Sequence, residues 1–73
     1  MSPVMLRQLW NLIEKTQVNT LLSLNDTTLV QWLIEQLKQE RGALNSDETN
    51  VIRAYLCSKL SLIRDMASAR LAS

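Results

Sequence analysis

The amino-acid sequence predicts an all-α protein: a single domain over residues 1–73 that folds as a three-helix bundle. Apolar residues recur at helical spacing along most of the chain, short polar residues interrupt them at two places, and no stretch alternates as a strand would. The 73 residues are enough for one hydrophobic core only. With 47% hydrophobic residues and a net charge of +1, the chain is too apolar and too weakly charged for intrinsic disorder.

The first helix is expected over about residues 3–20. Ser2 can accept a hydrogen bond from a backbone N–H of the first turn, and Pro3 lacks only a donor that the first turn does not need. The apolar and polar residues that follow at intervals of three and four are Met5, Leu6, Leu9, Leu12, Ile13, Thr16 and Gln17. β-Branched and short polar residues over 17–20 lower helix propensity, so the end of this helix is the least sharply defined.

Two further helices have clear start and stop signals. Polar residues over 23–28 favour a helix start and Gly42 suits a left-handed C-cap, which predicts a second helix over about 27–41. Asn45 and Glu48 have the spacing of a capping box, which predicts a third helix over about 46–70. The third helix is the longest of the three.

The second and third helices carry more apolar surface than one core requires. At 100° per residue, the apolar residues of the second helix cover roughly 200° of its circumference, whereas a helix facing one core needs a stripe little wider than ~100°. Trp32 and Ile34 cannot both lie on one narrow seam, so either this helix is central or part of it meets another chain. The third helix, about 36 Å long against about 22 Å for the second, carries apolar residues beyond the reach of the second. We therefore predict a homodimer in which the third helix is a main contact.

Six residues are candidates for partner binding, because they lie on this surplus surface or within the apolar stripe of the third helix. They are Trp32, Ile34, Lys59, Leu62, Ile63 and Met66. Among them Trp32 is the first choice, since tryptophan is enriched at binding hot spots. Lys59 has two interpretations: its stem packs while its ammonium reaches water, or it forms a specifying ion pair across an interface. The carboxylates considered for that pair are Glu14, Glu35 and Glu40.

Composition argues against several chemistries. The chain has no histidine and one cysteine, Cys57, so a zinc finger, histidine-based acid–base catalysis and an internal disulfide cannot be built. The carboxylates are accounted for by helix starts and surface pairs, and no oxygen-rich loop suits calcium. We therefore expect no catalytic residue, metal site or cofactor, and a protein that is not an enzyme. Without a long apolar run or a signal-like N-terminus, neither a membrane span nor export is expected, and the expected location is the cytoplasm.

The function that these patterns favour is a non-enzymatic protein–protein interaction module, or small adaptor, that acts as a helical homodimer. The alternative is a small helix-turn-helix-like DNA-binding regulator that uses the third helix, whose basic residues are Arg53, Arg64 and Arg70. Acidic residues at the start of that helix, Asp47 and Glu48, count against the alternative because they would approach the bases. Binding of nucleic acid is therefore not expected.

Four segments carry a resemblance to other proteins: 6–10 (LRQLW), 20–26 (TLLSLND), 29–33 (LVQWL) and 62–65 (LIRD). In these segments the chain resembles small all-helical proteins of cyanobacterial type whose activity is uncharacterised. The resemblance covers most of the chain. It implies a bacterial cytoplasm and supplies no activity, cofactor or catalytic residue.

Overall fold

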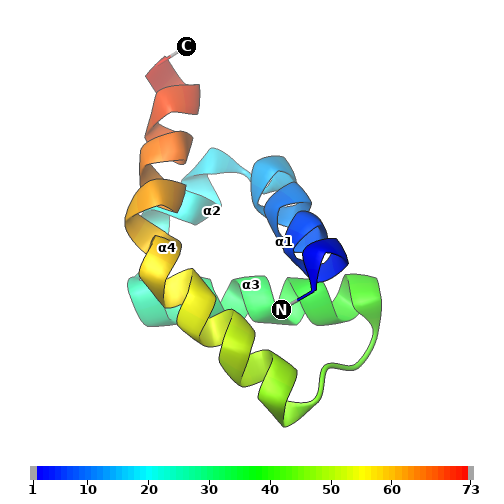
Figure 1. The fold of residues 1–73 in the computed structure, drawn as a ribbon. Helices are drawn as coiled ribbons and strands as arrows, with labels where there is room; N and C mark the ends of the chain where they lie inside the picture. The colour runs from blue at the N-terminus through cyan, green and yellow to red at the C-terminus, as the bar shows by residue number, and fades with distance from the viewer. Residues whose placement is uncertain (1, 73) are drawn as a thin grey trace.

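The computed structural model describes residues 2–72, which form four helices and no strand. The helices are α1 (Pro3–Lys15), α2 (Val18–Ser23), α3 (Asp26–Arg41) and α4 (Ser46–Ala72). Figure 1 shows α4 running the length of the molecule, with α3 beside its first half and α2 beside its second half. The all-α prediction is confirmed, whereas the number of helices is four rather than three.

The segment expected as one helix over 3–20 is two helices, because the chain turns at Thr16 and Gln17. Both residues are extended, with φ −74° and ψ 141° at Thr16 and φ −61° and ψ 140° at Gln17. The hydroxyl of Thr16 donates to a backbone carbonyl one turn earlier at 2.7 Å, a bond that competes with helix continuation. The guanidinium of Arg70 then donates to the carbonyl of Thr16 at 2.9 Å and to that of Glu14. The turn therefore depends on a residue from the far end of the chain.

The predicted caps are confirmed. Ser2 and Asn25 each accept a backbone N–H of the following turn, at 3.1 and 2.8 Å, and so begin α1 and α3. Asn45 and Glu48 form the reciprocal bonds of a capping box, at 2.7 and 3.2 Å, at the start of α4. Gly42 ends α3 with φ 91°, a conformation that residues with a Cβ rarely adopt.

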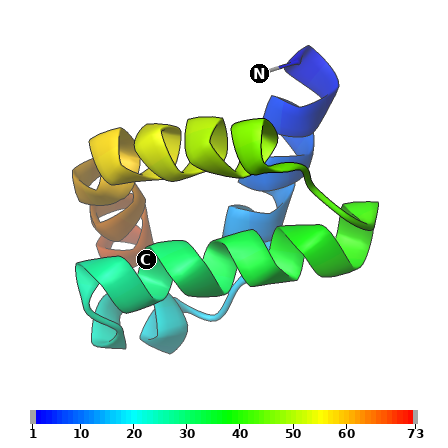
Figure 2. The ribbon, with the colours of Figure 1, turned by 90° about the horizontal axis from the view of Figure 1, so that it is seen from below.

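The hydrophobic core draws on all four helices. The buried apolar residues are Met5, Leu9, Leu12, Ile13, Leu21, Leu29, Val30, Leu33, Ile34, Leu37, Ile52, Leu56, Ile63 and Ala67. α3 packs against both α1 and α4, and α2 packs against α4 (Figure 2). The chain exposes 4528 Å² of surface, close to the roughly 4,600 Å² expected of a folded monomer of this size. A single copy therefore closes its own core.

Two of the six partner-binding candidates belong to this core, so the prediction that they lie on the surface is wrong. Ile34 is 0% exposed because α3 is a central helix, and α1 and α4 together cover its wide apolar arc. Ile63 is also 0% exposed. The predicted overhang of the last helix assumed that nothing lay beside it, but α2 packs there and its Leu21 lines the same depression as Ile63.

α4 curves near its middle, so that one helix serves two packing partners. Figures 1 and 2 both show the change of direction between the half beside α3 and the half beside α2. Ser58 lies in this region, and its hydroxyl donates to the carbonyl of Tyr55 at 2.7 Å. Such side-chain bonds to the preceding turn often bend helices. The curvature keeps residues on one side of α4 against the core along its whole length.

Candidate interaction surface

Few large apolar side chains remain exposed once the core is closed. Among residues 2–72 they are Val4, Val51, Leu62, Met66 and Leu71. Three of them, Val51, Leu62 and Met66, lie within about 60° of one another on α4 at 100° per residue, with Tyr55 between them. Leu71 falls about half a turn away from Leu62 by the same spacing. The helix thus presents one apolar stripe, defined here as Val51, Tyr55, Leu62 and Met66.

The stripe contains two of the predicted partner-binding residues and one that periodicity alone did not single out. Leu62 is 47% exposed and Met66 is 37% exposed. Val51, at 46%, was missed because the spacing of the apolar residues gave no indication which flank of the last helix would face the core. Its position one turn before Tyr55 was the available signal.

A pair of aromatic residues joins α1 to this stripe. The indole Nε1 of Trp10 donates to the Tyr55 hydroxyl at 2.8 Å, and the two rings meet edge to face with centroids 6.3 Å apart and planes at 85°. Both rings are half-buried and pack against the core. Helical periodicity gives no sign of this contact, because the two residues are 45 positions apart.

Lys59 lies beside the same pair. Its Nζ is 5.8 Å from the centroid of the Tyr55 ring, and the side chain is half-buried. The stem therefore packs while the ammonium lies over an aromatic face, which agrees with the snorkelling interpretation. Within residues 2–72 no carboxylate lies within ion-pair distance of this ammonium. We name Trp10, Tyr55, Lys59, Leu62 and Met66 the α1–α4 face.

Two depressions are lined in part by residues of α1 and α4. One depression, of about 260 Å³, is lined by Ser2, Met5, Arg41, Asp47, Glu48 and Val51. The other, of about 60 Å³, is lined by Ile13, Glu14, Leu21, Ile63, Met66, Ala67 and Arg70. α1 packs mainly on α3 rather than on α4. Along both helices, Trp10 and Tyr55 lie between the residues that line the two depressions.

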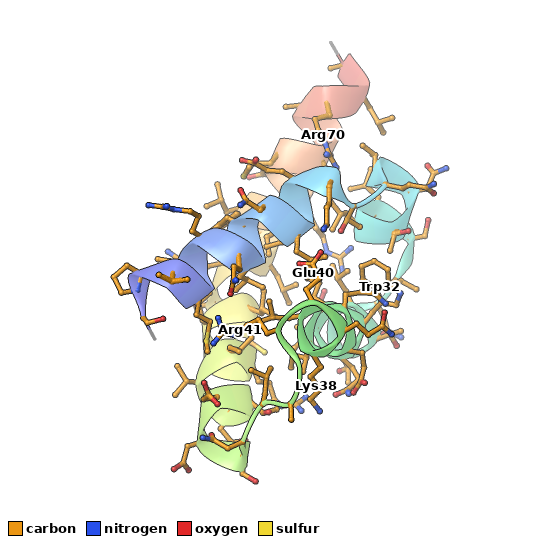
Figure 3. All side chains as sticks on the ribbon, turned by 90° about the vertical axis from the view of Figure 1, so that its right-hand side faces the viewer. Trp32, Lys38, Glu40, Arg41 and Arg70 are labelled. Atoms are coloured by element: carbon orange, nitrogen blue, oxygen red, sulfur yellow. The ribbon has the colours of Figure 1, made fainter. Side chains whose placement is uncertain are left out.

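Trp32, the first choice from the sequence, lies on a different surface. It is half-buried, and Figure 3 shows it on the side of α3 that faces α2. The shallow depression that it lines is otherwise formed by Leu12, Lys15, Thr16, Gln17, Thr20 and Gln36. Apart from Leu12 and Trp32 the lining residues are polar, and the ion pair of Lys15 with Glu40 lies near them, where α1 and α3 meet (Figure 3).

The arginines of the DNA-binding alternative contact their own chain. Arg53 donates twice to the Gln31 side chain at 3.3 Å. Arg64 donates to the carbonyl of Leu21 in α2, to that of Leu24 just after α2 and to the Asp26 carboxylate, each at 2.8 Å. Arg70 holds the end of α1, as described above. Arg64 and Arg70 therefore hold the ends of other helices, and Arg53 joins α4 to the side of α3.

Metal-ligand clusters and candidate membrane spans are absent from the described residues. In residues 2–72 no three histidine, cysteine, aspartate or glutamate side chains come together as metal ligands would. The thiol of Cys57 is free and exposed. No helix in this part of the chain combines the length and the apolar character needed to cross a bilayer.

Comparison of the chain with protein-family models, with curated proteins and with solved structures finds no match. The resemblance to small cyanobacterial-type proteins accordingly stays a prediction, and function is inferred from the surfaces described above.

Proposed function

We propose that this protein is a non-enzymatic protein–protein interaction module that acts as a helical homodimer through the α1–α4 face. The observation that carries the proposal is the stripe on α4. Three of the few large exposed apolar residues gather there beside two aromatic rings and one lysine. Clusters of aromatic and apolar residues next to a partly desolvated charge are typical of interface centres.

A dimer interface of ordinary size would have to use two helices. A stable complex buries about 800 Å² on each partner, roughly a sixth of the 4528 Å² that the chain exposes. With 27 residues, α4 is about 40 Å long and about 10 Å wide, so its projected area is only about half of what is needed. Contact with α1 has to supply the rest, and Trp10 is the part of α1 that extends the stripe.

The DNA-binding alternative has less support than this proposal. A helix that docks on DNA needs arginines or lysines that reach phosphates or bases. Arg64 and Arg70 instead donate to backbone carbonyls within the chain, and releasing them would leave those carbonyls without a donor.

Sedimentation equilibrium of the whole chain at tens of micromolar tests the proposal. The wild type is expected to sediment as a dimer and Leu62→Glu as a monomer, because the variant places a carboxylate in the middle of the stripe. Leu71→Glu is the matched control: Leu71 is more exposed, at 62%, and lies on the other side of α4. A monomeric wild type, or equal loss of dimer in both variants, would contradict the proposal.

A further inference from the structure

The depression beside Trp32 is formed by three helices and lies outside the α1–α4 face. Its volume is about 440 Å³, within the range of roughly 300–1,000 Å³ that small-molecule sites occupy. Figure 3 shows Trp32 on the side of α3 that faces α2. Gln36 lies one turn further along α3, while Gln17 and Thr20 come from the start of α2. Folding therefore brings one indole and three neutral polar side chains together.

Contacts made by neighbouring residues hold the walls of this depression in place. Arg70 donates to the carbonyl of Thr16 at 2.9 Å, in the turn that precedes Gln17. Lys15, at the end of α1, forms an ion pair with Glu40 of α3. A site that is already formed in the free protein loses little conformational freedom when a ligand binds. The depression meets this condition.

The polar groups of the depression are available to a ligand. Within residues 2–72, the side chains of Gln17, Thr20 and Gln36 form no hydrogen bond with the protein. The indole Nε1 of Trp32 likewise has no acceptor in this part of the chain, and it reaches solvent, because no polar side-chain atom there is both buried and without a partner. Amide and hydroxyl groups both donate and accept hydrogen bonds. The ligand that suits them also carries groups that do both.

The charge and the aromatic content of the lining narrow the class of ligand. Among the described residues that line the depression, Lys15 is the only charged one, and its ammonium pairs with Glu40. An anion or a cation would therefore gain little Coulomb attraction there. Trp32 is the single aromatic residue of the same set, so a ligand meets an aromatic ring on one face only. A neutral ligand with one apolar face and a polar edge fits this lining.

We propose that the depression binds the pyranose ring of a neutral sugar. The C–H groups on one face of such a ring stack on the exposed part of the half-buried Trp32 indole. The hydroxyl groups at its edge donate to and accept from Gln17, Thr20 and Gln36. Because the depression is shallow, a dissociation constant of about 1 mM is expected. None of these residues belongs to the α1–α4 face, so sugar binding is separate from the homodimer proposed above.

Nuclear magnetic resonance of the two indole N–H groups tests the proposal in the whole chain. Methyl β-glucoside, cellobiose, maltose and N,N′-diacetylchitobiose are each added to about 50 mM, well above the expected dissociation constant. At least one of them is expected to shift the Trp32 signal to saturation, while the signal of Trp10, whose N–H is bonded to Tyr55, stays in place. Trp32→Phe identifies the two signals. Inorganic phosphate is the charged probe and is expected to shift neither.

Two variants test the polar contacts. Gln36→Leu and Thr20→Val each remove hydrogen-bonding groups at nearly constant size, and are expected to weaken sugar binding about fivefold. Gln31→Leu is the matched control, because it makes the same change on the side of α3 where Arg53 of α4 donates, and it is expected to leave binding unchanged. Circular dichroism reports whether each variant is folded. Thr20 is exposed, so its variant keeps the test decisive if Gln36→Leu does not fold.

Several results would overturn sugar binding at this place. They are a Trp32 signal that none of the four sugars shifts, signals of Trp10 and Trp32 that move together, and phosphate that binds more tightly than every sugar. Equal weakening by Gln31→Leu and Gln36→Leu would do the same. The homodimer is unaffected by these outcomes, since sedimentation of the wild type and Leu62→Glu tests it separately.

Discussion

At the scale of single residues, three arginines of α4 form hydrogen bonds to distant parts of the chain that could not be predicted from their spacing. Arg64 shows this most clearly, since its guanidinium joins α4 to the carbonyl of Leu21 in α2, to that of Leu24 just after α2 and to Asp26. A guanidinium has five N–H donors in a fixed fork, which suits several acceptors at once. The α2–α3 connection therefore depends on a residue that is 40 positions away from one of the carbonyls it holds.

Arg64→Met is expected to lower the free energy of unfolding by about 1–3 kcal/mol, because two partly buried carbonyls lose a charged donor. Arg53→Met is the control. Its longer bonds to Gln31 lie on the surface, so about 0.5 kcal/mol or less is expected. Urea unfolding followed by circular dichroism gives both values. Equal losses of unfolding free energy would show that the carbonyl contacts of Arg64 stabilise the fold no more than the surface contacts of Arg53.

At the scale of helices, local and long-range causes can be separated. The starts of α1, α3 and α4 are fixed by side chains within three residues of the helix, as the capping bonds show. α2 is different, because a helix of six residues is not stable by itself in water. It persists because Leu21 is buried against α4 and because Arg64 binds the carbonyl of Leu21 at its end.

Asn45→Ala is expected to destabilise the chain by about 1 kcal/mol, since it removes the acceptor for the first N–H groups of α4. Asn50→Ala provides the comparison, because Asn50 is an exposed residue inside α4 where alanine is the better helix former. Thermal unfolding should give a lower Tm for the first variant and an equal or higher one for the second. A similar Tm for both would mean that the capping box does not stabilise α4.

Leu21→Ala tests the anchoring of α2. The side chain is 1% exposed, so its truncation is expected to cost about 2–5 kcal/mol through lost burial and the cavity that remains. Substitution of Leu22, its half-buried neighbour, by alanine should lower the free energy of unfolding by less. If Leu22→Ala proves the more damaging change in urea unfolding, the orientation of α2 against α4 is wrong.

At the scale of the whole molecule, the core is closed within one chain, yet one surface remains apolar. The exposed area matches that of a monomer of this size, so association is not needed to complete the core. The homodimer that we propose therefore adds stability to a chain that already folds, and its strength depends on protein concentration.

The midpoint of thermal unfolding is accordingly expected to rise with protein concentration. For a dimer, each tenfold increase in concentration above the dissociation constant adds about 1.4 kcal/mol per mole of dimer. Scans of the wild type over two decades of concentration, with Leu62→Glu beside it, measure this effect. A midpoint that is independent of concentration in both proteins would contradict the dimer.

The sequence was sufficient for the features that neighbouring residues control. The all-α class, the caps at Ser2, Asn45 and Gly42 and the length of the last helix all follow from hydrogen bonds and periodicity within a few residues. Leu62 and Met66 were also correctly placed on the surface, although the reason is the side of α4 on which they lie and not an unpartnered end of that helix.

Contacts between distant segments determine the features of the fold that the sequence did not predict. Arg70 binding near Thr16 accompanies the split of the first predicted helix, α2 buries Ile63, and the two-sided packing of α3 buries Ile34. Helical periodicity specifies which residues share a side of one helix, but not which other helix lies against that side. The α1–α4 face likewise exists only because folding brings Trp10 to Tyr55 across 45 positions of the chain.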